Sequence, residues 1–329
     1  MGMDMLKFSS TKIAKITILV ENKADLIVQS SDRVEYFTEE PLLAEHGFSA
    51  LVELNGSGEY ILWDAGVSRI ALINNLKLMK IDPGVIKMIA ISHGHLDHYA
   101  AMKDLLELMD PLPAAREWSP SVSSSQVDAW QDLHRVPVIL HPAALRERWS
   151  VRDDGTMVGP YQPPPWKEWE SSGAQMILSE GPYQLAAGCW ATGYVPRKSF
   201  EGAGRSKKRL YRDGSGFNPD HLEDDQAILI NLEEKGLVVL SGCAHSGIVN
   251  TIEHARMMSG VDRVHAVIGG FHLATAGDDE ISKTVEFLSE INPELIVPCH
   301  CTGLRAISLI ASKMSDVFVE GVVGACFTF

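Results

Sequence analysis

The spacing of apolar and polar residues predicts alternating strands and helices over the first third of the chain. Short runs rich in β-branched residues are typical of strands, and apolar residues at three- and four-residue spacing are typical of helices. The Gly-rich turn at 55–58 joins two of the strands into a hairpin. The predicted strands are 15–21, 48–54, 59–64 and 85–91, and the predicted helices are 68–79 and 100–109.

The same alternation returns after residue 224. Three of its strands each run into a loop that carries a histidine, namely His245, His272 and His300. If these strands belong to one sheet, we expect the three loops to meet at one edge of it. The predicted strands are 227–232, 237–240, 264–268 and 295–297, with one helix starting near 248, another at 281–291, and a last helix and strand at the end.

The segment between these two regions differs in composition and in the spacing of its apolar residues. Residues 111–220 hold most of the tryptophans, a Pro-Pro-Pro run at 163–165 and short strands such as 136–140. We therefore expect a single domain over 1–329, with 111–220 as an inserted, lid-like elaboration that covers the site. Its basic cluster either recruits an anionic substrate or is a solvated loop, and the second interpretation is favoured. The cluster comprises Arg205, Lys207, Lys208, Arg209 and Arg212.

Composition narrows the class of protein. The 329 residues are 45% hydrophobic and 22% charged, which is typical of a folded globular protein. A net charge of −14 repels phosphate backbones and argues against a nucleic-acid partner, while a small anionic substrate remains compatible with local basic groups. No apolar run is long enough to span a membrane, and Met1–Val20 lacks the apolar core of a signal peptide. Five cysteines suit a reducing compartment, so we expect a cytoplasmic protein of undetermined oligomeric state.

The strand at 85–91 runs into a loop with four potential metal ligands, His93, His95, Asp97 and His98. Imidazole and carboxylate groups are the ligands that zinc and similar divalent metals accept. Alternation lets His93 and His95 point the same way, whereas Asp97 and His98 follow the strand end and can turn toward a second metal. The alternative interpretation is a polar loop in which Asp97 caps the next helix.

Later loops supply further candidates, Cys243, His245, His272 and His300, and His300 is the strongest because it follows a buried-type strand. Asp64, at the end of its strand, could contact the metal loop or cap the next segment. A lone histidine is more often an ordinary polar residue. That interpretation is preferred for His134, His141, His221, His254 and His265.

Together these residues resemble the metallo-β-lactamase superfamily: the loop His93-Gly94-His95-Leu96-Asp97-His98, with Asp64 upstream and His300 downstream. The resemblance implies an α/β fold, a four-layer αββα sandwich with two divalent metals at one edge. It implies that His93 and His95 serve one metal, while Asp97, His98 and His300 serve the other. Zinc is the expected metal, with iron or manganese as alternatives.

A narrower resemblance covers most of the chain and points to the dihydropterin-ribofuranosylaminobenzene-phosphate synthase branch. It is carried by 45–47, 92–98, 192–193, 196–197, 200–201, 241–247, 269–273 and 300–303. The chain departs from the superfamily at Tyr99-Ala100-Ala101 and at Cys243, which replaces the usual bridging aspartate. The third ligand of the first metal is then Asp225, Cys243 or His245, with His245 preferred, and Cys243 either ligates or packs.

The leading functional hypothesis is a metal-dependent hydrolase that acts through a metal-bound hydroxide on a small phosphoester or other anionic ester. Asp97 would orient the nucleophile, His272 would bind the substrate and stabilise its charge or donate a proton to the leaving group, and Arg197 would bind the substrate anion. One alternative is a transferase that joins a pterin diphosphate to an arylamine ribose phosphate. Another is a non-catalytic metal- or ligand-binding protein.

Overall fold

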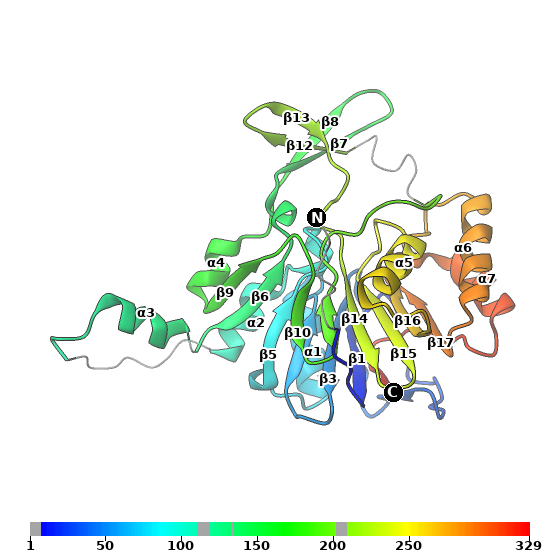
Figure 1. Ribbon diagram of the computed structural model, residues 1–329, viewed down its shortest axis with the longest axis horizontal. Helices are drawn as coiled ribbons and strands as arrows, with labels where there is room; N and C mark the ends of the chain where they lie inside the picture. The colour runs from blue at the N-terminus through cyan, green and yellow to red at the C-terminus, as the bar shows by residue number, and fades with distance from the viewer. Residues whose placement is uncertain (1–7, 111–118, 133, 202–208) are drawn as a thin grey trace.

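Two large sheets packed face to face form the body of the protein (Figure 1). The structure is a computed structural model and describes residues 8–110, 119–132, 134–201 and 209–329. None of the helices in these ranges is long and apolar enough to cross a membrane.

The first sheet has eight strands in the order β2-β18-β1-β3-β4-β5-β6-β9. Strands β1, β3 and β4 pair antiparallel, whereas β4, β5, β6 and β9 run parallel. Because parallel strands end at the same edge, the loops after β4 and β5 lie side by side. The bounds are β1 Ala14–Val20, β2 Glu35–Tyr36, β3 Ser49–Leu54, β4 Tyr60–Trp63, β5 Ile86–Ala90, β6 Val136–Leu140, β9 Ala174–Leu178 and β18 Ala325–Thr328.

The second sheet has six strands in the order β10-β11-β14-β15-β16-β17. Strands β15, β16 and β17 are parallel, so the loops that carry His245, His272 and His300 leave at one edge, as the sequence predicts. The bounds are β10 Tyr183–Ala186, β11 Cys189–Ala191, β14 Ala227–Leu232, β15 Gly236–Ser241, β16 Val264–Gly270 and β17 Leu295–Cys299.

Three buried apolar clusters separate four layers. One fills the space between the sheets, where Ile16 and Trp63 of the first sheet join Ile228 and Leu240 of the second. The others lie between each sheet and its outer helices. The fold is therefore the expected αββα sandwich. The helices are α1 Arg69–Leu78, α2 Met102–Met109 and α4 Trp166–Ser171 over the first sheet, and α5 Ile248–Ser259, α6 Asp278–Ile291 and α7 Leu304–Lys313 over the second.

A third, four-stranded sheet stands apart from the sandwich, at the top of Figure 1. Within the segment 111–220, β6 and β9 extend the first sheet, and β10 and β11 extend the second. Helix α3, Ser124–Asp132, projects from the body. The strands of the small sheet are β7 Arg148–Val151, β8 Met157–Tyr161, β12 Arg209–Asp213 and β13 Gly216–Pro219.

Candidate metal centre and adjoining pocket

Three histidine rings converge on one point beyond the ends of β5 and β15. Nε2 of His93 lies 2.9 Å from Nδ1 of His95, and Nε2 of His245 lies 3.1 Å and 3.0 Å from these two nitrogens. Burial is the largest cause that lowers the pKa of each ring, that of His95 to about 3, so all three are neutral near pH 7. A neutral imidazole offers the lone pair that a metal requires.

A second group gathers around the carboxylate of Asp97. Its Oδ2 lies 3.6 Å from Nε2 of His98, 3.5 Å from Nε2 of His300 and 3.3 Å from Nε2 of His46. Burial raises the pKa of Asp97, but His300 and His98 outweigh it and hold that pKa well below its usual range. Asp97 is therefore an ionised carboxylate beside two imidazoles, and it could offer an oxygen ligand to a metal.

Cys243 lies between the two groups. Its Sγ is 3.2 Å from Nε2 of His98. The same sulfur belongs to three sets of potential ligand atoms, and the atoms of each set lie within 4.8 Å of one another. These sets pair Cys243 with His93 and His98, with His300 and Cys301, and with His245 and His272. The sulfur thus lies where it can contact either metal position.

Asp64 fixes the orientation of the metal loop from beneath. Its Oδ2 lies 2.6 Å from Nδ1 of His98, and its two oxygens accept hydrogen bonds from the backbone and hydroxyl of Ser92 at 2.7 Å. Burial alone would lower the pKa of His98, but Asp64 outweighs it and raises this pKa to about 9. Gly242 makes this packing possible, since a Cβ there would lie 2.3 Å from Oγ of Ser92. Of the two interpretations of Asp64, contact with the metal loop is the one observed.

The donor set fits divalent metals at both groups. Within the described ranges, the buried Nε2 of His300 has no hydrogen-bond partner, which is costly for a polar atom unless a ligand occupies that position. Nitrogen, carboxylate and thiolate ligands suit zinc, and nitrogen and oxygen suit iron or manganese. The first group can hold one cation and the second another, with Cys243 between them.

The chain was compared with known proteins. Residues 43–116 match the model of the metallo-beta-lactamase superfamily. An uncharacterised protein of Methanocaldococcus jannaschii is 30% identical over 282 residues, which cover 85% of this chain and 92% of that protein. The chain belongs to the metallo-β-lactamase superfamily.

Within this superfamily, a named relative is 28% identical over 295 residues, 88% of this chain and 92% of the relative. It is the 7,8-dihydropterin-6-methyl-4-(beta-D-ribofuranosyl)-aminobenzene-5'-phosphate synthase of Methanocaldococcus jannaschii. Among solved structures, Tm1679, a metal-dependent hydrolase of the beta-lactamase superfamily, has a TM-score of 0.67 and 23% identity, over 96% of this chain and 98% of its own. YhfI of Bacillus subtilis, a metallo-beta-lactamase fold protein, has a TM-score of 0.53 and 11% identity, over 97% of this chain and 100% of its own.

Superfamily membership supports an enzyme that binds divalent metals, and it narrows the interpretation of the ligand candidates. His245 joins His93 and His95 in a converging group, whereas Asp225 is in none of the groups found among the described residues. Oδ2 of Asp225 instead accepts a hydrogen bond of 2.7 Å from the backbone of Ser246, next to His245. Of the three candidates for the third ligand, His245 lies with both His93 and His95, whereas Cys243 lies with His93 and His98.

The remaining predicted residues have varied positions. His272 lies against His245, with ring centroids 4.1 Å apart. Arg197 donates to the backbone oxygen of Leu222 at 3.2 Å and does not line the pocket beside the metal loop. His141 caps a short helix by accepting from the backbone of Ala143. Within the described residues, the five histidines interpreted as ordinary join none of the converging groups: His134, His141, His221, His254 and His265.

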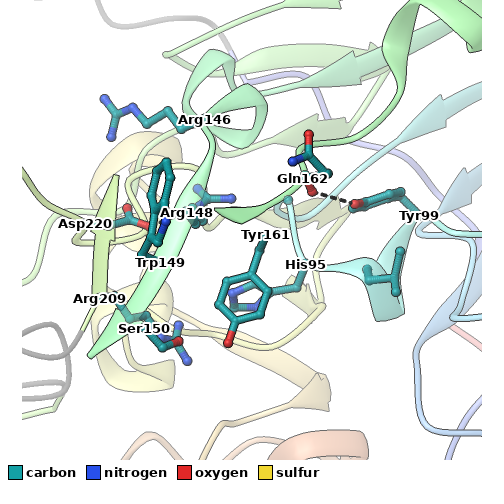
Figure 2. A pocket seen from close by; sticks show the side chains of 12 residues that line it. His95, Tyr99, Arg146, Arg148, Trp149, Ser150, Tyr161, Gln162, Arg209 and Asp220 are labelled. Atoms are coloured by element: carbon teal, nitrogen blue, oxygen red, sulfur yellow. Dashed lines mark hydrogen bonds and ion pairs between the residues drawn. The ribbon is translucent and has the colours of Figure 1, made fainter. Parts of the chain in front are cut away.

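A pocket of about 400 Å³ opens beside His95, between the metal loop and the small sheet (Figure 2). Its walls combine aromatic and cationic side chains. Tyr99 donates a hydrogen bond from its hydroxyl to the backbone oxygen of Gln162 at 3.3 Å, which closes one side. The other principal side chains are Arg146, Arg148, Trp149, Tyr161 and Arg209.

Arg148 ties the small sheet to the metal loop. Its guanidinium donates to Asp220 at 2.7 Å and to Asp224 at 2.6 Å, and all three side chains are buried. Asp224 in turn accepts a hydrogen bond of 2.7 Å from the backbone of Gly94, between His93 and His95. The pocket wall and the first metal group are therefore joined by one continuous set of hydrogen bonds.

Arg209 differs from the other two arginines because no described carboxylate lies within ion-pair distance of its guanidinium. Arg146 pairs with Glu223, and Arg148 pairs with Asp220 and Asp224. The positive charge of Arg209 lowers the pKa of both His95 and His245. Arg209 is thus a cation available to an anion close to the first metal group.

Sequence reasoning missed several of these residues. His46 was noted only within Glu45-His46-Gly47, although its ring lies 5.1 Å from that of His300. Arg209 was grouped with a basic cluster interpreted as solvated, and Arg205, Lys207 and Lys208 of that cluster lie outside the described residues. Arg148 begins β7 and Arg146 lies two residues before it, so two arginines at this close spacing were the available signal for the pocket.

Proposed function

We propose that this protein hydrolyses a small anionic ester, a phosphoester before others, with two divalent metals. One observation supports this proposal above all. Two groups of potential ligands, His93-His95-His245 and Asp97-His98-His300, lie beside a pocket lined by Arg209, a cation with no carboxylate partner among the described residues. Two divalent cations held there would lower the pKa of a water molecule and polarise the substrate oxygen.

The residues of the chain have distinct roles in this proposal. The ionised carboxylate of Asp97 accepts a hydrogen bond from the attacking water and so orients it. Arg209 binds the anionic group of the substrate by charge-assisted hydrogen bonds, a role that replaces the one expected of Arg197. His272, against His245, donates a proton to the leaving group.

A second candidate is the transferase that joins a pterin diphosphate to an arylamine ribose phosphate. Two observations favour it: the relative named as a synthase, and aromatic walls at Tyr99, Trp149 and Tyr161 on which planar rings can stack. In that reaction Arg209 would bind a phosphate of either substrate, and the pocket would exclude water.

The test is turnover by metal-loaded protein on a panel of phosphomonoesters, phosphodiesters, lactones and β-lactams. We expect hydrolysis of a phosphoester that a chelator abolishes and added metal restores. Arg209→Gln should lower kcat/KM by about 10- to 100-fold, because a charged hydrogen bond contributes about 1.5–3 kcal/mol. Arg212→Gln is the matched control, since Arg212 is on the same strand but exposed.

Full activity after chelation would contradict the proposal, and so would equal losses in Arg209→Gln and Arg212→Gln. Incubation with a pterin diphosphate and an arylamine ribose phosphate separates the two candidates. A coupled product detected by mass spectrometry supports the transferase, whereas diphosphate release without coupling supports the hydrolase.

A further inference from the structure

We propose that Cys243 and Cys301 form a redox-sensitive thiol pair, which a hydroperoxide converts into a disulfide that withdraws the Cys243 sulfur from the metal centre. The modification itself is independent of the proposed function. Only its effect on metal binding rests on the two ligand groups described above.

The first observation is the proximity of the two sulfur atoms. Both Sγ atoms and a ring nitrogen of His300 lie within 4.8 Å of one another. The thiol of Cys301 donates to the backbone oxygen of Cys243 at 3.4 Å, so the sulfur lies directly over the Cys243 backbone. A disulfide requires the two sulfur atoms to lie about 2.05 Å apart, so bond formation requires the two side chains to rotate toward each other.

The second observation is the space that Gly270 leaves between the two cysteines. A Cβ on Gly270 would lie 2.7 Å from Sγ of Cys301 and 3.3 Å from Cα of Cys243. Because glycine has no side chain, Sγ of Cys301 can lie close to the backbone of Cys243 at this position. The loops after β15, β16 and β17 thus converge on the pair.

Exposure gives the two thiols different parts in the reaction. Cys301 is partly exposed, whereas Cys243 is buried with 3% of its surface accessible. A small oxidant therefore meets Cys301 first. Cys189 and Cys299 are buried, and Cys326 lies elsewhere, with its sulfur 3.5 Å from Oγ1 of Thr17.

The chemistry balances with a hydroperoxide as the oxidant. The Cys301 thiolate attacks one peroxide oxygen, the O–O bond breaks, and a sulfenic acid and hydroxide (or alkoxide) result. The Cys243 thiolate then attacks the sulfenic sulfur, forms the S–S bond and displaces hydroxide, which takes up a proton to become water. Two thiols are oxidised by two electrons and one peroxide is reduced.

The disulfide would change the metal centre, because Sγ of Cys243 lies 3.2 Å from Nε2 of His98 and is shared by both ligand groups. A disulfide sulfur is neutral and a much weaker ligand than a thiolate. A carboxylate at this position could not undergo this reaction. The replacement of the usual bridging aspartate by Cys243 thus makes the centre sensitive to oxidation.

The test uses the full chain, treated with hydrogen peroxide and then alkylated without reduction. Peptide mapping by mass spectrometry should find Cys243 linked to Cys301 within one chain, with two of the five thiols lost and recovered on adding dithiothreitol. Bound metal, followed with a chromophoric chelator, should be released in parallel. Cys301→Ser should form no disulfide and retain metal under peroxide, with Cys301→Ala as a second variant and Cys326→Ser as the control that behaves like wild type.

Several outcomes would overturn the proposal. These are unchanged thiols after peroxide, oxidation of Cys301 to an acid without a link to Cys243, a disulfide between two chains, or metal loss that persists in Cys301→Ser. If the protein with the Cys243–Cys301 disulfide keeps its full metal content, the disulfide does not control metal binding. None of these readouts needs a substrate, so failure here is distinct from failure of the proposed hydrolase.

Discussion

Oδ2 of Asp64 lies 2.6 Å from Nδ1 of His98, and both side chains are fully buried. The carboxylate sets the ring orientation of a histidine whose other nitrogen faces Asp97 and Cys243. Such an outer carboxylate typically contributes 10- to 100-fold to metal affinity.

Replacing Asp64 with Asn should therefore weaken binding at the second group by about 10- to 100-fold and leave the first group nearly unchanged. Titration against a chromophoric chelator measures both affinities. Asp104→Asn, at a partly exposed carboxylate of α2 that pairs with Arg69, is the matched control. Equal affinities in Asp64→Asn and wild type would show that Asp64 does not support His98.

Replacing Arg148 with Met should destabilise the protein by about 3–5 kcal/mol, because it leaves the buried carboxylates of Asp220 and Asp224 without their cation. Urea unfolding measures the loss. Arg263→Met breaks an exposed pair with Glu294 and should cost about 1 kcal/mol or less. Similar losses in the two variants would refute a structural role for the Arg148 network.

Gly94 lies in the metal loop where no side chain fits. A Cβ there would lie 2.5 Å from the backbone oxygen of Ala144 and 2.6 Å from Nη1 of Arg148. Gly94→Ala should displace His93 and His95 and lower metal content, with a stability loss of about 1–3 kcal/mol. Gly277→Ala, where φ is −73° and an added Cβ would have nothing within 4 Å, controls for the loss of a glycine. Normal metal content in Gly94→Ala would contradict this tight packing.

Glu21 should make stability depend on pH. Burial is the main cause that raises its pKa to about 7, against the hydrogen bond of 2.6 Å that it accepts from the backbone of His300. Because the folded pKa exceeds the unfolded value of 4.5, the stabilising contribution is full below pH 4.5 and is lost as pH rises through 7. The change amounts to about 3 kcal/mol.

Glu21→Gln should flatten this dependence, and urea unfolding of chelator-treated protein at pH 5 and pH 8 measures it. Relative to the variant, the free energy of unfolding of the wild type should be lower at pH 8 than at pH 5. Parallel pH profiles for the two proteins would contradict the burial of an uncharged Glu21.

The alternating strands and helices and the loop from His93 to His98 were predicted because both depend on local patterns, whereas the αββα sandwich was expected from the resemblance to the metallo-β-lactamase superfamily. Apolar strands such as β5 and β15 are continuous in sequence, and His93 to His98 lie within one loop. The pocket was missed because it depends on distant pairings. Arg148 meets Asp220 across 72 residues, and the strands of the small sheet are short and partly exposed. Arg197 was chosen for its charge, although its guanidinium contacts a backbone oxygen that the sequence gives no means of anticipating.

The pairing of Cys243 with Cys301 was beyond sequence reasoning for the same reason. The two residues are 58 positions apart, and their approach depends on the parallel order of β15, β16 and β17. By contrast, the convergence of His245, His272 and His300 followed from three strands that each end in a histidine loop.

The most direct test of the central claim is the metal content of freshly purified protein by inductively coupled plasma mass spectrometry. Two divalent ions per chain are predicted for wild type, with about one remaining in His245→Ala and about one in His300→Ala, since each variant removes a ligand of a different group. The account would be contradicted if wild-type protein loaded with divalent metal retained none of it. It would also be contradicted if both variants held as much metal as wild type.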